Sequence, residues 1–207
     1  MHNTLESART VARWQTAFNI VFMALFMLMS IAAWQNLRTS GSLRALSVLA
    51  VNVLFLGLFL ARRTAQAESS SPGLWILGMV TMLLPLLLRP GGQGWSGLGA
   101  ALQMAGLAGV AGGLLSLRRS FAVAPANRGV RDTGLYRIVR HPIYFSELLL
   151  LLGVVLANPT LGNLLILLCE CGLQAARARA EEHLLSSDPV YRAYRKRVRY
   201  GLIPGLI

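Results

Sequence analysis

The side chains best suited to chemistry fall on one face of an apolar helix that the sequence predicts over residues 161–186. At 100° per residue, five polar side chains of this stretch lie within about 60° of one another. A polar stripe on a membrane helix faces lipid only at a large cost, so we expect it to line the protein interior or a cavity. The five residues are Asn163, Glu170, Gln174, Arg177 and Glu181.

A second apolar arm, Pro142–Ala157, precedes this helix and is joined to it by the turn signal Asn158-Pro159-Thr160. Reflection of one arm onto the other, in which residues equally far from this turn along the chain lie at the same depth, places Glu147 level with Glu170. Two carboxylates at one depth indicate a shared proton or a polar pocket. The alternative is that both cap the ends of helices in the wet headgroup region.

The stretch Thr133–Tyr144 brings a histidine, two tyrosines and arginines to the start of this hairpin. Pro142 suits the first turn of a helix, where its missing N–H costs nothing, so His141 is expected at the mouth and Tyr144 one turn in. Taken alone, these residues are equally well explained as positive-inside arginines and interfacial aromatics. The same reflection pairs Arg140 with Arg177, and Tyr136 with Glu181.

The composition is that of a membrane protein. Only 14% of the 207 residues are charged and 55% are hydrophobic, although the net charge is +12. A disordered basic tail or a histone-like nucleic-acid binder would be poor in Leu, Ile and Phe. An ordinary soluble domain would carry about 25% charged residues. We therefore expect the membrane, and not nucleic acid, to be the partner of this chain.

Six apolar segments approach the roughly 20 residues that a membrane-spanning helix needs. They are Trp14–Trp34, Leu43–Ala61, Leu74–Leu88, Leu98–Leu117, Pro142–Ala157 and Leu161–Ala176. The predicted fold is an all-α polytopic membrane helix bundle of five to six transmembrane segments. We expect four membrane helices over 1–117, then a connector, the helical hairpin and basic interfacial helices over 118–207, all in one integrated domain. Small residues in the fourth segment permit close helix packing.

The cations predict the topology. If six segments cross the membrane, all but three of the 20 Lys and Arg residues fall on the side that holds both termini. The positive-inside rule then makes both termini cytoplasmic, in an integral membrane protein whose expected setting is a bacterial inner membrane. The polar stretches 118–141 and 177–207 share that face, where a water-soluble cofactor can reach them. The three cations on the opposite side are Arg38, Arg44 and Arg89.

Two other patterns carry no function. Gly92–Gly97 matches the dinucleotide-binding G-x-G-x-x-G, but that motif needs a preceding strand and a following helix, and here it follows a membrane segment. Cys169 and Cys171 point about 200° apart on a helix. They therefore predict neither a disulfide with each other nor a metal site.

The two polar stretches resemble the two-part signature of the isoprenylcysteine carboxyl methyltransferase superfamily, which includes phospholipid N-methyltransferases. The resemblance covers residues 120–207. The first part is met by Thr133, Gly134, Tyr136, Arg137, Val139, Arg140, His141, Pro142 and Tyr144. The second part is met by Arg177, Glu181, Glu182, Leu185, Tyr191, Tyr194, Arg197 and Val198.

This resemblance implies a pocket for S-adenosylmethionine at the cytoplasmic end, and it places Arg177 against the substrate, where an arginine suits a carboxylate. We add Glu147 as a polar group on the substrate side. Four arginines lie where a ligand carboxylate would be held: Arg128, Arg131, Arg140 and Arg177. The residues that the resemblance assigns to the cofactor are Arg128, Gly129, Val130, Arg131, Tyr136, His141, Pro142, Ile143, Tyr144 and Glu181.

The sequence departs from the family pattern at two places. Phe145-Ser146 stands where a small residue usually follows the His-Pro-x-Tyr block, and the spacing from the glutamate pair to Tyr191 is shorter than in the prenylcysteine enzymes. Both departures bear on the substrate more than on the cofactor.

The residues and the resemblance together predict an integral-membrane methyltransferase that transfers a methyl group from S-adenosylmethionine, without a metal, to a lipophilic or membrane-associated acceptor. A prenylated cysteine carboxylate, a phospholipid amine and a small thiol all remain open as acceptors. One alternative is a non-methylating isomerase of the nitric-oxide-reductase-associated type, which would need haem, although the three histidines, His2, His141 and His183, leave few axial ligands. The other is a binding or transport protein whose basic face serves anionic lipid.

Overall fold

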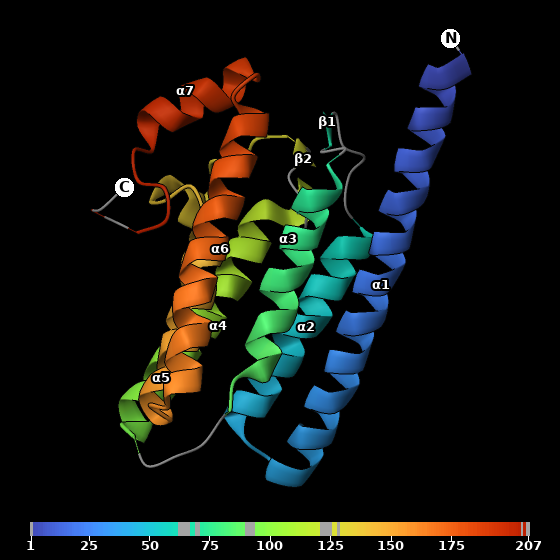
Figure 1. The fold of residues 1–207 in the computed structure, drawn as a ribbon. Helices are drawn as coiled ribbons and strands as arrows, with labels where there is room; N and C mark the ends of the chain where they lie inside the picture. Colours follow the sequence, from blue (N-terminus) through green and yellow to red (C-terminus); the bar gives the residue numbers. More distant parts are fainter. Residues whose placement is uncertain are drawn as a thin grey trace.

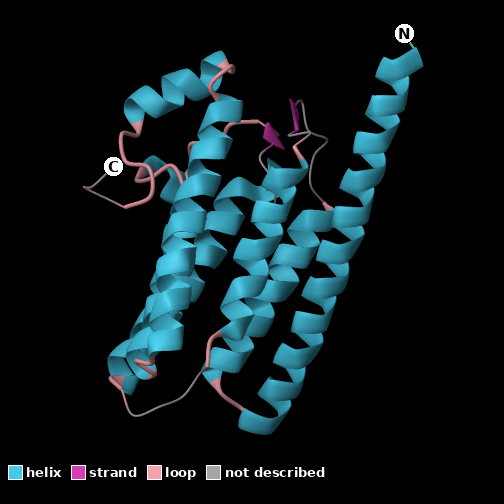
Figure 2. Cartoon of the chain, in the orientation of Figure 1, coloured by secondary structure: helices cyan, strands magenta, loops and turns pink. Residues whose placement is uncertain are grey.

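The computed structural model describes residues 2–61, 67–68, 71–89, 94–120, 126–127, 129–203 and 205. Within this part of the chain the structure is an all-α bundle, which confirms the predicted fold class (Figures 1 and 2). Its helices are α1 (His2–Ser40), α2 (Leu43–Leu60), α3 (Pro72–Leu83), α4 (Ser96–Leu117), α5 (Pro142–Ala157), α6 (Leu161–Leu185) and α7 (Pro189–Arg197). Three short 3-10 turns accompany them: η1 (Leu84–Leu87), η2 (Arg118–Ser120) and η3 (Gly134–Arg137).

Three of the described helical stretches are long and apolar enough to cross a membrane: Thr16–Ser40, Ser96–Leu117 and Leu161–Leu185. The other three members of the bundle are shorter apolar helices, Ala45–Leu60, Pro72–Leu87 and Pro142–Ala157. The protein is therefore a helical membrane protein.

Helices α1 to α6 stand side by side and alternate in direction (Figure 1). We call the end that carries α7 the upper end; the N-terminus lies there too, as does the pairing of β1 (Ala67–Glu68) with β2 (Ala126–Asn127). The turn Asn158–Thr160 lies at the opposite, lower end. This arrangement brings the polar residues that precede α5 and those that end α6 to one end of the bundle.

The hairpin of α5 and α6 has clear start signals. Pro142 is the first residue of α5, as expected for a residue without an N–H. The hydroxyl of Thr160 caps α6 by accepting from the Asn163 N–H at 3.3 Å. Asp188 caps α7 in the same way, accepting from the Val190 N–H at 2.8 Å.

Helices α4 and α5 are in unusually close contact because glycines line their interface. A Cβ placed on Gly106 would lie 2.7 Å from the backbone N of Leu150, and one placed on Gly153 would lie 2.8 Å from the backbone N of Gln103. Both distances are too short for a real side chain, so the predicted close approach of the fourth apolar segment is confirmed. This contact fixes α5, and with it the residues at its upper end.

The lower end of the hairpin is closed by Asn163, which is 2% exposed. Its side-chain amide donates to the backbone oxygens of Arg89 and Asn158, and its Oδ1 accepts from the Arg89 N–H. Gly94 and Trp95, in the described part of the glycine-rich stretch, donate to backbone oxygens at the end of α5. Asn163 is thus a structural member of the polar stripe.

The simple reflection of one hairpin arm onto the other is wrong by about one helical turn. The Gln174 amide, and not Glu170, meets Glu147, with 2.6 Å between Nε2 and Oε2. Arg140 meets Glu182, and not Arg177. The reflection assumes that both arms leave the turn at the same height, but α6 is shifted along its axis relative to α5.

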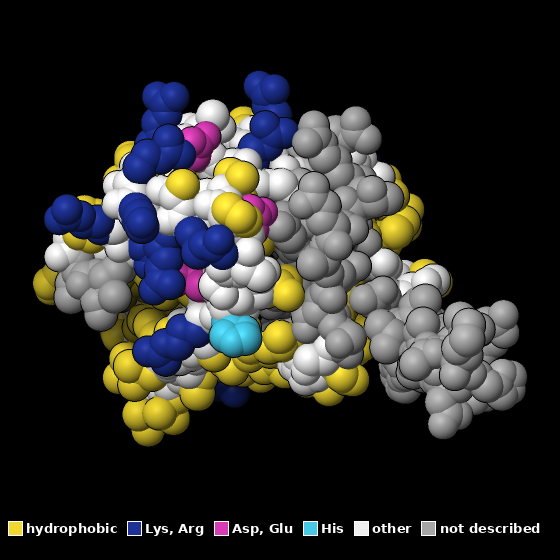
Figure 3. Space-filling model, turned by 90° about the horizontal axis from the view of Figure 1, so that it is seen from above, with side chains coloured by type: hydrophobic (Ala, Val, Ile, Leu, Met, Phe, Trp, Pro, Cys, Tyr) yellow, Lys and Arg dark blue, Asp and Glu magenta, His cyan; other side chains and the backbone are white. Residues whose placement is uncertain are grey.

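The segment after α6 folds back over the upper end of the hairpin. The Tyr194 hydroxyl donates to the backbone oxygen of Tyr136 at 2.9 Å. The residues that follow α7 make further contacts: the backbone oxygens of Tyr200 and Gly201 accept from the N–H groups of Arg140 and His141. The basic last turn of α7 faces outward, and Lys and Arg side chains gather on this end when it is viewed from above (Figure 3).

Candidate functional site

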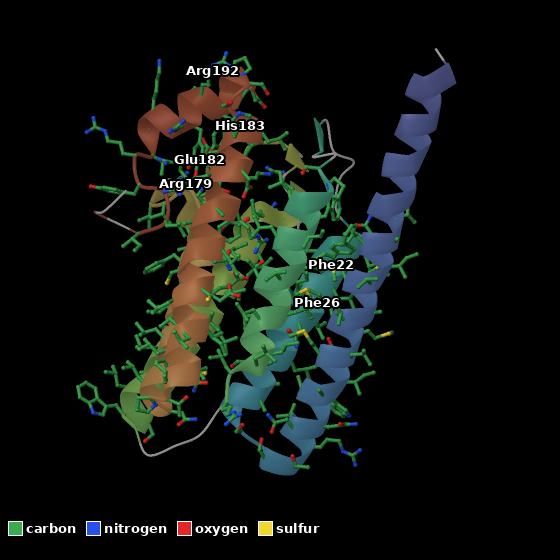
Figure 4. The ribbon with its side chains drawn as sticks, viewed as in Figure 1. Phe22, Phe26, Arg179, Glu182, His183 and Arg192 are labelled. Carbon is green, nitrogen blue, oxygen red and sulfur yellow. The ribbon has the colours of Figure 1, made fainter. Side chains whose placement is uncertain are left out.

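A cavity of about 340 Å³ lies inside the bundle and is lined by residues from each of the helices α1 to α6. One wall, from α1 to α3, is largely apolar; Phe22 and Phe26 point from α1 toward the other helices (Figure 4). The other wall, from η3, α5 and α6, is polar. Its polar residues are Tyr136, Arg140, His141, Tyr144, Glu147, Glu170, Gln174, Arg177 and Glu181.

The upper end of the cavity is formed where α5 begins. The rings of His141 and Tyr144 are stacked, with centroids 5.4 Å apart and planes 2° from parallel. The Tyr144 hydroxyl donates to Glu181 Oε2 at 3.0 Å, and His141 Nδ1 lies 3.7 Å from the same oxygen. A carboxylate accepts about four hydrogen bonds, so Glu181 keeps capacity for a ligand.

Glu182 holds Arg140 and His141 in place through its side-chain carboxylate. Its Oε1 lies 2.7 Å from Arg140 Nε and 3.1 Å from His141 Nε2. Arg140 also donates to the backbone oxygens of Val198 and Arg199, and it is 9% exposed. Three of the five N–H donors of Arg140 are therefore used within the protein, which gives this residue a part in holding the fold at the edge of the cavity.

A chain of polar contacts runs down the middle of the cavity. The Arg177 guanidinium lies over the Tyr144 ring, 4.7 Å from its centroid. It also donates to Thr81 Oγ1 at 3.0 Å and to Gln174 Oε1 at 3.3 Å. Gln174 in turn donates to Glu147, which orients that carboxylate. Arg177 and Glu147 thus belong to one connected network.

Below this network, two buried polar side chains have atoms without a hydrogen-bond partner in the described part of the chain. Glu170 is 0% exposed, and neither of its carboxylate oxygens is bonded. Asn52 on α2 is 6% exposed, and its Nδ2 is unpaired. Both residues line the cavity.

Tyr136, which lines the upper end of the cavity, keeps its hydroxyl proton over the whole ordinary pH range. Burial, helped by the negative charge of Glu181, raises the pKa of Tyr136 well above its ordinary value. The phenol therefore stays protonated. Burial similarly raises the pKa values of Tyr191 and Tyr194, two residues of α7 that pack against Val198.

Of the residues assigned from the sequence to the cofactor or to the substrate side, seven line the cavity together. Five come from the set that the resemblance assigns to the cofactor, and two from the substrate side. They are Tyr136, His141, Ile143, Tyr144, Glu181, Arg177 and Glu147.

The remaining assigned residues lie elsewhere. Val130 packs against the cluster of Tyr191, Tyr194 and Val198. Arg131 Nε donates to Ser120 Oγ at 3.2 Å, and only the serine lines the cavity. Gly129 has a φ of +94°, which favours glycine. Pro142 is buried at the start of α5 without lining the cavity, and Arg128 lies outside the described residues.

Several cavity residues were missed from the sequence. Thr81, Asn52 and Ser120 approach from α3, α2 and η2. Thr81 and Asn52 carried a usable signal, because each is an isolated polar residue within an apolar segment, and such residues face the interior of a bundle. The apolar wall carried none, because any Phe or Val of a membrane helix looks alike in the sequence.

Fold and site together define a helical membrane protein with a half-polar, half-apolar cavity between its helices. Residues 74–198 match the family described as "Protein of unknown function (DUF1295)". This match spans more than half of the chain, from α3 to α7, and the chain belongs to that family. No curated protein matches the sequence.

Proposed function

We propose that the protein is an integral-membrane methyltransferase that uses S-adenosylmethionine and acts on a lipophilic or membrane-associated acceptor. One observation carries the proposal: His141, Tyr144 and Glu181 form a cluster at the upper end of a cavity that continues downward between apolar helices. A polar cofactor and an apolar acceptor need such a two-part site. The sequence signature of the methyltransferase superfamily lies on the same residues.

The residues present fit the cofactor. Glu181 can accept from its amino or ribose groups, and the stacked faces of His141 and Tyr144 favour a positively charged sulfur. A cavity of about 340 Å³ is at the small end of ligand sites. It holds one nucleoside-sized molecule, so the acceptor would enter with its reactive group and leave its chain in the bilayer.

When bound, S-adenosylmethionine supplies an electrophilic methyl group. The protein's own part is to bind and orient both reactants, which converts a bimolecular reaction into an effectively unimolecular one. Tyr136, protonated at ordinary pH, can donate a hydrogen bond to the cofactor at the upper end of the cavity. An amine or thiol acceptor releases a proton when it is methylated, and Glu147, held by Gln174, can receive that proton; a carboxylate acceptor releases none.

The basic upper end supports the proposed orientation. The cations at the end of α7 lie at the end of the bundle that also holds the N-terminus and the His141 cluster. The proposed setting is the inner membrane of a bacterium. By the positive-inside rule this end faces the cytoplasm, where S-adenosylmethionine is made. The cofactor would enter from the water and the acceptor from the bilayer.

The test is calorimetric titration of the purified protein with S-adenosylhomocysteine. We expect saturable binding, weakened about tenfold or more by Glu181→Ala and by His141→Ala because each removes a ligand contact. Lys196→Ala, at an exposed position on α7, is the control and should bind normally. No binding by the unmutated protein would contradict the proposal and favour a binding or transport role; a haem Soret band would favour the isomerase.

A further inference from the structure

We infer that Glu170, together with Asn52, forms a second polar subsite in the cavity, and that this subsite takes the amine of a lipophilic molecule. The inference rests on the proposed function and deepens it, because it selects the amine among the carboxylate, amine and thiol acceptors. It is carried by the unpaired atoms of these two side chains, which are both carboxylate oxygens of Glu170 and Nδ2 of Asn52, and by the acidic and basic groups around them.

The position of Glu170 makes its lack of a partner costly. It is nine residues into α6, which at 1.5 Å per residue places it about 14 Å from the lower end of the helix, near the middle of a hydrocarbon core about 30 Å thick. It is 0% exposed and neither oxygen is bonded within the described residues. A buried carboxyl group without a hydrogen bond is strongly unfavourable, which a ligand with donor groups would relieve.

The charges around the subsite favour an amine over a carboxylate. Two acidic side chains, Glu147 and Glu170, face the cavity here against one cation, Arg177. That cation already donates to Thr81 and Gln174 and stacks on Tyr144. A ligand carboxylate would face two carboxyl groups and an arginine that is already bonded, whereas an amine would supply the donors that Glu170 lacks.

Asn52 and the apolar wall complete the description of the ligand. The unpaired Nδ2 of Asn52 approaches from α2 and can donate to an oxygen carried near the amine. Phe22, Phe26 and Phe55 line the same cavity and suit the part of an alkyl chain that lies next to the amine, while the rest of the chain stays in the bilayer. The expected ligand is therefore an amine on a hydrocarbon chain, either a single-chain amine or the headgroup of an aminophospholipid.

The experiment measures binding without S-adenosylmethionine. The purified protein, in nanodiscs of phosphatidylcholine, is titrated with octylamine, octanoate and octanol, which share a chain and differ in the polar group. We expect saturable binding of octylamine, and affinities about tenfold or more weaker for the other two ligands. Equal or tighter binding of octanoate or octanol would overturn the inference. Nanodiscs that contain phosphatidylethanolamine then identify the source, since a bound headgroup amine would compete with octylamine.

The variants separate this subsite from the cofactor site. Glu170→Gln keeps the shape of the side chain and should weaken octylamine binding about tenfold, while S-adenosylhomocysteine still binds. Cys169→Ala, at the neighbouring exposed position of the same helix, should bind both normally. Unchanged octylamine binding in Glu170→Gln overturns the inference alone. Amine binding that depends on Glu170 in a protein that never binds S-adenosylhomocysteine would sustain the subsite and overturn the proposed function.

Discussion

Tyr144 is held between two partners, since its ring lies under the Arg177 guanidinium at 4.7 Å and its hydroxyl donates to Glu181 at 3.0 Å. The ring thus joins the upper end of the cavity, where we propose that the cofactor binds, to the polar chain in its middle. Because ring and hydroxyl serve different neighbours, substitutions can separate the two functions.

Tyr144→Phe removes the hydroxyl and keeps the stacked ring. We expect the free energy of unfolding to fall by about 1 kcal/mol, the usual contribution of one hydrogen bond. The affinity for S-adenosylhomocysteine should fall several-fold, because Glu181 loses the hydrogen bond that orients it. Tyr144→Ala also removes the stacking surface and should weaken binding further. Calorimetric titration of both variants measures this difference. Equal affinities in the two would mean that the ring contributes nothing.

Glu182→Gln should damage stability more than any other conservative change at the upper end. It leaves Arg140, 9% exposed, without its charge partner, and breaking a buried pair costs about 3 kcal/mol or more. Asp132→Asn is the matched control, because the Asp132–Arg197 pair is short at 2.6 Å but exposed. Exposed pairs contribute at most about 1 kcal/mol. Denaturant unfolding of the detergent-purified variants provides the comparison, and similar losses would refute a structural role for Glu182.

Gly106→Ala should destabilise the bundle by about 1–3 kcal/mol, because overpacking forces α4 and α5 apart. Gly57→Ala on α2 is the control, since an added Cβ there meets nothing within 4 Å. It should be neutral or slightly stabilising, as alanine favours a helix more than glycine does. Thermal unfolding of the two variants checks the expected order. A reversed order would place the tight helix contact elsewhere.

The orientation can be tested by cysteine labelling in a background in which Cys169 and Cys171 are changed to serine. Ser187→Cys lies at the upper end, between α6 and α7, and Trp95→Cys lies at the lower end, where Trp95 is 72% exposed. In spheroplasts, a membrane-impermeant maleimide should label the cysteine at position 95 directly and the one at 187 only after lysis. Labelling in the opposite order would place the basic end outside the cell.

Much of the helix bundle follows from the sequence alone. A segment such as Ser96–Leu117 is identified by its length and apolar content, and Pro142 and Thr160 mark where α5 and α6 begin. The polar stripe on α6 was also predictable, because its spacing brings Glu170, Gln174, Arg177 and Glu181 to one face, and these four residues do line the cavity.

Contacts between helices were not predictable in the same way. The pairing of Glu147 with Gln174 depends on how far α6 slides along α5, which no local pattern determines. The burial of Arg140 depends on oxygens of Val198 and Arg199, far along the chain. Asn163 has the same spacing as the cavity residues, yet it closes the lower loop. In each case, the outcome is decided by a partner that lies outside the motif.

The backbone contacts of Arg140 and His141 with Tyr200 and Gly201 have a consequence for biosynthesis. During translation, all six helices that line the cavity leave the ribosome before residues 198–201 do. Completion of the site therefore depends on residues that are synthesised after all six of these helices. A nascent chain that is already anchored in the membrane would acquire its rigid His141 cluster only when the later segment folds back onto it.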